Sequence, residues 1–83
     1  MSQSIPIEVH HGKGAVAVVV RLPDVRAKDI RISLTRDELS IHADTPGHVR
    51  NYSLRLATRV DDRRATMRFS DGVLWMHLPV LRP

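Results

Sequence analysis

Five histidines are the residues of this chain best suited to metal binding or acid–base chemistry: His10, His11, His42, His48 and His77. The first two are adjacent, so on a strand they would point to opposite faces, and the other three lie far apart along the chain. None has a carboxylate or thiolate beside it at the spacing of a metal site, and the chain contains no cysteine. The sequence therefore predicts no metal site and no thiol chemistry.

Catalytic motifs are missing as well. The sequence has no nucleophile with a base at motif spacing, no glycine-rich phosphate loop and no pair of carboxylates on an inward strand face. We therefore predict that the chain is not an enzyme and uses no cofactor.

Positive charge is the remaining chemical feature. Thirteen Lys and Arg residues against nine Asp and Glu residues give a formal net charge of +4 at pH 7. All of the thirteen except Lys13 and Lys28 are Arg, whose planar guanidinium makes bidentate contacts with carboxylates and phosphates. Acidic partners fit this composition. The alternative is that the Arg residues are scattered over solvent-facing strand positions, as in most soluble domains.

These side chains must be positioned by β-strands, because apolar and polar residues alternate along most of the chain. We predict strands over residues 5–10, 15–22, 30–34, 38–43, 51–57, 65–70 and 73–79, separated by segments rich in Gly, Pro and Asp. Asp71-Gly72 has the composition of a two-residue hairpin turn. The pattern predicts an all-β, immunoglobulin-like β-sandwich of about seven antiparallel strands, in a single domain over residues 1–83.

No segment of the sequence has the length or apolarity to cross a membrane. The longest uncharged apolar run, residues 15–20, is far shorter than the ~20 residues that a spanning helix needs. The N-terminus also lacks a basic region followed by an apolar one. We expect a soluble, cytoplasmic protein.

Alternation assigns the residues of each strand to a face. Trp75 should point outward, opposite Leu74 and Met76, together with Ala17 and Val19 from a neighbouring strand. An exposed apolar patch of this kind often marks a partner site, although a chain terminus folded over it would serve equally well. Trp75 and Val19 are therefore candidate interface residues.

Two motifs resemble a known family. Residues 20–34, VRLPDVRAKDIRISL, are similar to the pattern Asp-Leu-Pro-Gly-Val-x-x-x-Asp-Ile-x-Val-x-Val, and Asp71-Gly72-Val73-Leu74 is similar to Asn-Gly-Val-Leu. Their order and spacing resemble the alpha-crystallin domain of the small heat-shock proteins over residues 16–79. The compact form is also similar to CS-type co-chaperone domains and to the crystallin-like domain that accompanies arsenical-pump-type ATPases.

The resemblance implies a binding groove between two strands. The family docks an Ile-x-Ile anchor there, and in this chain the lining would be Ile30, Ile32, Leu34, Ala65, Met67 and Phe69. Met67 stands where the family has Ala, so this edge carries a larger side chain. Ile5-Pro6-Ile7 has the form of the anchor but lies at the other end of the chain. Either Ile5 and Ile7 bind the groove of a neighbouring molecule, or they belong to an edge strand that tolerates Pro6.

The resemblance also bears on assembly. Arg55 aligns with an arginine on the strand that lines the dimer interface of animal members, which implies an intersubunit ion pair; the alternative is an exposed Arg in at most a weak surface pair. Typical bacterial and plant members exchange a strand through a long loop, where this chain has only residues 44–50. Seven residues cannot reach a neighbour and return, because an extended chain spans at most ~3.3–3.6 Å per residue. Since the family's long N-terminal arm and C-terminal anchor are also missing from this sequence, we expect a monomer or a small homo-oligomer such as a dimer, without loop exchange.

These features predict an ATP-independent, chaperone-like module, either a small heat-shock protein core or a co-chaperone adaptor. It would bind client or partner proteins, with an ATPase as one candidate partner, and no small-molecule substrate or membrane. The rival interpretation is a basic β-barrel that binds nucleic acid. Against it, the chain has one Phe, one Tyr and one Trp, which is too few for the aromatic platforms on which bases stack.

Overall fold

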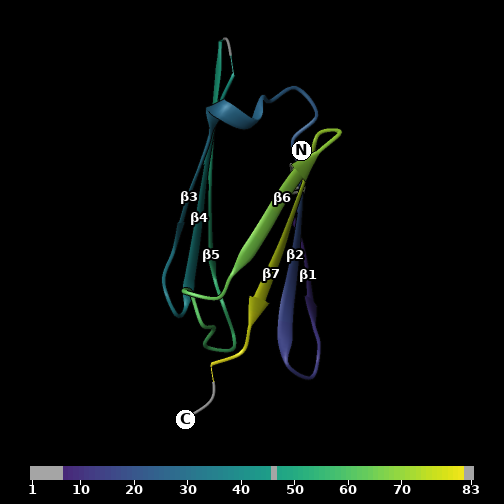
Figure 1. Cartoon of the computed structure of the whole chain (residues 1–83). Helices are drawn as coiled ribbons and strands as arrows, with labels where there is room; N and C mark the ends of the chain where they lie inside the picture. The colour runs from purple at the N-terminus through teal and green to yellow at the C-terminus, as the bar shows by residue number, and fades with distance from the viewer. Residues whose placement is uncertain (1–6, 46, 82–83) are drawn as a thin grey trace, which may run out of the picture.

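Two antiparallel β-sheets lie face to face in the structure, a computed structural model that describes residues 7–45 and 47–81 (Figure 1). The first sheet contains four strands in the order β1 (Ile7–His11), β2 (Ala15–Arg21), β7 (Val73–Pro79) and β6 (Thr66–Ser70). The second contains β3 (Ile30–Leu34), β4 (Glu38–Thr45) and β5 (His48–Arg55), in that order. The predicted all-β sandwich is confirmed.

The core lies between the sheets and is entirely apolar among the described residues. In the four-stranded sheet the register pairs three Val residues of β2 with Leu78, Met76 and Leu74 of β7, all of them buried. Each fully buried side chain of this size stabilises the folded state by about 1.5–3 kcal/mol, which chain entropy largely offsets in a small domain. The inward and outward faces predicted from alternation are therefore correct for these strands.

The β6–β7 hairpin closes as its sequence predicts. Ser70 pairs with Val73, so Asp71 and Gly72 form the turn, with φ angles of 51° and 74°. Positive φ at both central residues is the geometry that Asp-Gly favours, because it matches the twist of the two strands.

The prediction of a seven-residue connection over residues 44–50 was wrong. The pairing of β4 with β5 continues to Thr45 and His48, so only residues 46 and 47 separate the strands. The hairpin projects past the neighbouring strand ends (Figure 1), and the side chains of Asp44 and Val49 are exposed. The apolar alternation that marks a strand in the sequence fades there, because these residues lie beyond the core.

Several strand bounds also differ from the predicted ranges. β5 ends at Arg55, not at residue 57, since the Leu56 amide leaves the sheet and donates to the Asp37 carbonyl at 2.7 Å. β2 ends at Arg21, because the Leu22 amide turns to donate to the Gly72 carbonyl at 2.7 Å. The first strand extends to His11, with residues 5 and 6 outside the described residues, and β6 begins at residue 66.

The chain crosses from the first sheet to the second through a short 3₁₀ turn, η1 (Ala27–Asp29). The Asp29 amide closes this turn by donating to the Arg26 carbonyl at 2.9 Å. Within residues 7–45 and 47–81, no helix is long and apolar enough to cross a membrane.

Candidate partner-binding surfaces

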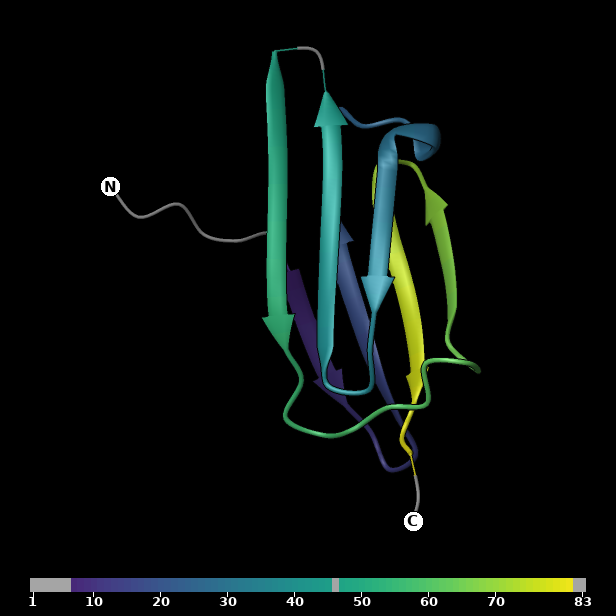
Figure 2. The same ribbon diagram turned by 90° about the vertical axis from the view of Figure 1, so that its left-hand side faces the viewer.

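The predicted groove residues come together on one side of the sandwich. β3 and β6 are edge strands of different sheets and lie on the same side of the molecule (Figure 2). The apolar side chains of this edge that are half-buried and packed against the core are Ile30, Ile32, Leu34, Ala65 and Phe69. We call this set, together with Met67, the β3–β6 edge.

Met67 is the exposed member of the β3–β6 edge. It lies directly opposite the buried Met76 on β7, which places it on the inward face of the sheet, yet 51% of its surface is accessible. It is exposed because no described strand lies on the outer side of β6. An apolar side chain of this kind, at the rim of the core and beside an open strand edge, is a natural contact for an extended polypeptide.

Ile7 lies on the inward side of β1, in register with Val20, and packs against the core of its own chain. This position of Ile7 agrees with the alternative in which it belongs to an edge strand of its own chain. Ile5 lies outside the described residues, so its docking to a neighbouring molecule stays a prediction.

Arg55 ends β5 and is exposed, in register with Glu38 on β4. β5 is an edge strand on the side of the sandwich opposite the β3–β6 edge (Figure 2). A second copy of the chain could therefore reach Arg55, and its predicted interface role stays a prediction.

Trp75 points outward from the four-stranded sheet, as alternation predicts. Its neighbours across the strands are Val19 on β2 and Arg68 on β6. The indole is 48% exposed, and Val19 and Ala17 beside it are partly buried. No described terminal segment covers the ring. Sequence reasoning identified Trp75 and Val19 here but missed Arg68, because its position beside the indole follows from the pairing of β6 with β7.

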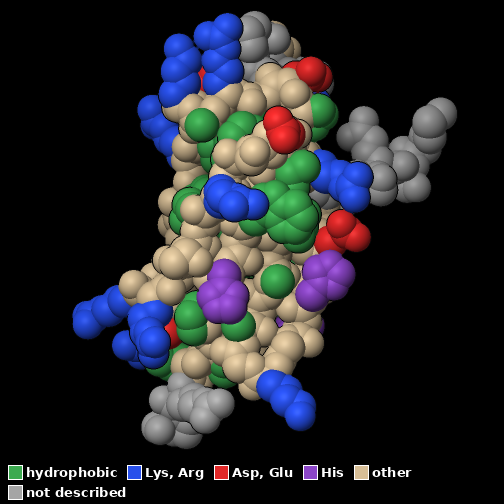
Figure 3. All heavy atoms as spheres, turned by 45° about the vertical axis from the view of Figure 1, so that its right-hand side comes forward, with side chains coloured by type: hydrophobic (Ala, Val, Ile, Leu, Met, Phe, Trp, Pro, Cys, Tyr) green, Lys and Arg blue, Asp and Glu red, His purple; other side chains and the backbone are tan. Residues whose placement is uncertain are grey.

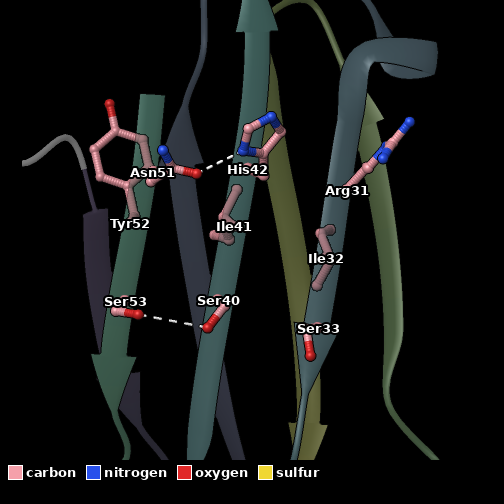
Figure 4. A pocket seen from close by; sticks show the side chains of 9 residues that line it. All are labelled: Arg31, Ile32, Ser33, Ser40, Ile41, His42, Asn51, Tyr52 and Ser53. Atoms are coloured by element: carbon pink, nitrogen blue, oxygen red, sulfur yellow. Dashed lines mark hydrogen bonds between the residues drawn. The ribbon is translucent and has the colours of Figure 1, made fainter. Parts of the chain in front are cut away.

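The outer face of the three-stranded sheet is polar and carries a shallow hollow of about 320 Å³ (Figure 4). The Nδ1 atom of His42 donates a hydrogen bond to the Asn51 side-chain carbonyl at 2.5 Å, and the hydroxyl groups of Ser40 and Ser53 meet at 3.5 Å. Both pairs are directly opposite in the register of β4 and β5. These bonds tie two strands together, and no serine hydroxyl in the hollow is hydrogen-bonded to a histidine that could activate it.

Histidine and carboxylate side chains are dispersed over the structure. Within the described residues, no group of three or more His, Cys, Asp or Glu side chains could hold a metal ion.

Sequence reasoning also missed Val49, which is 60% exposed on the projecting part of β5. The predicted ranges placed it in a connection, where an isolated apolar residue carries little information. The pairing of Asp44 with Val49, which the sequence does not state, places Val49 on β5.

The sequence and the fold of this chain are similar to those of known proteins. No family model matches the chain. Heat shock protein 16 of Schizosaccharomyces pombe is 26% identical over 91 residues, which cover 88% of this chain and 64% of that protein. The solved structure of heat shock protein 16.0 from the same organism matches with a TM-score of 0.82 and 26% identity, over 96% of this chain and 89% of that chain. The chain is a homologue of the small heat-shock proteins of the alpha-crystallin type.

More distant structures share the fold of this small heat-shock protein homologue. Hsp14.1 from Sulfolobus solfatataricus has a TM-score of 0.80 at 24% identity, over 94% of this chain and 72% of that chain. A small heat-shock protein from Xylella fastidiosa has a TM-score of 0.79 at 18% identity, over 99% and 91% of the two chains. The chain spans 64% of the length of its curated relative, which is less than two thirds. The resemblance inferred from the sequence motifs is confirmed.

Proposed function

We propose that this chain is an ATP-independent, chaperone-like module that binds exposed apolar segments of other polypeptides. Its relationship to the small heat-shock proteins supports a binding role over an enzymatic one. The observation that carries the proposed binding site is the exposure of Met67, at 51%, beside half-buried apolar side chains of β3 and β6.

Two properties of the β3–β6 edge suit an extended apolar segment. Each edge strand has backbone groups on its outer side without a neighbouring strand, which is the arrangement that accepts an added strand. The flexible, polarizable thioether of Met67 adapts to side chains of different shape. Backbone pairing thus supplies affinity that depends little on sequence, and the apolar side chains select segments rich in Ile, Leu or Val.

Suppression of client aggregation tests the proposal. The chain should slow the heat-induced aggregation of a model client without ATP, and Met67→Asp should remove most of this protection, because a carboxylate at the rim repels an apolar segment. The matched control is Ser70→Asp, which adds the same charge to the outward face of β6. Circular dichroism and urea unfolding verify that both variants are folded.

The proposal fails if Met67→Asp and the wild-type chain protect the client equally, or if Ser70→Asp loses as much protection as Met67→Asp. An ATPase recovered as the main binding partner by copurification and mass spectrometry, with no protection of the client, would instead make the chain an adaptor.

A further inference from the structure

The outer face of the four-stranded sheet carries a second surface, centred on Trp75. Around the indole is a shallow hollow of about 440 Å³, whose outward lining residues are Ala17, Thr66, Arg68, Trp75 and His77. Figure 3 shows this face, with hydrophobic side chains near its centre and basic, histidine and acidic side chains around them. We call this set the Trp75 surface.

The outward strand positions of this sheet carry more positive than negative charge. Three adjacent strands, β2, β7 and β6, carry no Asp or Glu on their outward positions, whereas they carry Arg21 and Arg68. The single outward carboxylate of the sheet is Glu8 on the edge strand β1, and it already pairs with Arg21 at 3.7 Å. Arg68 has no ion-pair partner among the described residues, although it stands directly opposite Trp75.

We propose that the Trp75 surface binds a short acidic segment of a partner protein, in which one large apolar side chain lies between Asp or Glu residues. The apolar side chain packs against the indole in the hollow, and Arg68 receives a neighbouring carboxylate through its guanidinium fork. Trp and Arg are the side chains that most often carry the binding energy of protein interfaces, and here they are in register on adjacent strands.

A nucleic acid fits this surface less well. Binding of single strands relies on several aromatic platforms for successive bases, and Trp75 is the only Phe, Tyr or Trp on the outward positions of β2, β6 and β7. A short acidic protein segment needs one apolar pocket with a positive charge beside it. Trp75 and Arg68 provide these on adjacent strands.

Met67 of the β3–β6 edge also lines the hollow around Trp75, but the outward side chains of the Trp75 surface lie on the other face of β6. Thr66 and Arg68 alternate along β6 with Met67 and Phe69, so the two sets point to opposite faces of the sheet. Loss of binding at the Trp75 surface should leave the protection of an aggregating client unchanged, and the two proposals can fail independently.

Fluorescence provides the test, because Trp75 is the only tryptophan of the chain. The probe is a synthetic peptide, Asp-Glu-Asp-Leu-Glu-Asp, and its control is Asn-Gln-Asn-Leu-Gln-Asn. The acidic peptide should change the emission of Trp75 to saturation, with an affinity that falls as salt is added. Arg68→Gln should weaken this binding about tenfold, since it removes a charge-assisted hydrogen bond.

Arg31→Gln is the matched control, because Arg31 is an exposed outward residue on an edge strand of the other sheet. It should bind the acidic peptide as the wild-type chain does. Equal affinity for the acidic and neutral peptides, or an Arg68→Gln variant with unchanged affinity, would overturn the proposal. Tighter binding of a thymidine oligonucleotide than of the acidic peptide would also overturn it, in favour of nucleic acid.

Discussion

Gly72 joins the β6–β7 turn to the adjacent end of β2. Its φ of 74° lies in the left-handed region, and a Cβ atom there would meet the Pro23 Cα atom at 2.9 Å. Its carbonyl accepts the Leu22 amide at 2.7 Å, so the β6–β7 turn packs directly on the end of β2. Any side chain at this position must move the backbone of another segment.

Gly72→Ala should therefore lower the free energy of unfolding by about 1–3 kcal/mol, the range expected for left-handed backbone in a non-glycine residue. Urea unfolding followed by Trp75 emission measures the change. The control is Gly14→Ala, because a Cβ atom at Gly14 has no neighbour within 4 Å. A loss of stability that is equal in both variants would show that the contact with Pro23 is unimportant.

The direction of a side chain was predictable from the sequence where it depends only on the alternation within its own strand. Trp75 was placed outward by alternation within β7 alone. The roles of Arg68 and of the His42–Asn51 pair depend on which residue of the next strand lies opposite, and the sequence does not state that register. A pair across strands becomes visible only when the turn between them is recognised.

Among the elements, the β4–β5 hairpin is the one that bears on strand exchange between molecules. Its strands pair from Glu38 and Arg55 to Thr45 and His48 within one molecule, with two residues at the turn. Such a hairpin leaves no loop that could carry a strand to a neighbouring molecule. The absence of loop exchange stays a prediction, which the two-residue turn favours and which began from a longer connection.

A disulfide across the hairpin tests this pairing. The chain has no cysteine, and the hydroxyl groups of Ser40 and Ser53 lie 3.5 Å apart. The double variant Ser40→Cys, Ser53→Cys should form an intrachain disulfide on mild oxidation, because directly opposite residues have Cβ atoms close enough to bridge. On a non-reducing gel it should migrate as a monomer. The single variant Ser40→Cys is the control, and a covalent dimer formed efficiently by the double variant alone would indicate strands exchanged between molecules.

The strand ends were less predictable than the strands themselves. Apolar alternation identifies residues that face the core, so it located β3 and β7 with the bounds that the structure has. It made the β4–β5 hairpin too short, because the tip of the hairpin has no core to face. It also extended the fifth strand to residue 57, past Leu56, which is buried but whose amide donates outside the sheet. In the middle of a sheet, the inward residues are both buried and paired with a neighbouring strand. At the ends of the strands, a residue can be buried without strand pairing or paired without burial.

On the scale of the whole molecule, the sandwich is thin. Its extents are 44 × 30 × 19 Å, and two stacked sheets lie about 10 Å apart, so the core is a single layer of side chains. The composition and the strand number predicted this architecture. The order of strands in each sheet, which places β3 with β6 and β1 with β5 at the two sides (Figure 2), could come only from the family resemblance or the structure.

A thin sandwich with four open strand edges should gain stability from association. A domain of this size buries a smaller fraction of its surface than a larger one, and folding in a dimer adds buried area at the edges. We expect the thermal midpoint to rise over a hundredfold range of protein concentration, since only the folded chain associates. Arg55→Ala should reduce this rise if the β5 edge forms the contact, whereas Arg31→Ala on the β3 edge strand should leave it unchanged. A midpoint independent of concentration, with a monomer mass in sedimentation, would show that the single layer of core side chains is sufficient by itself.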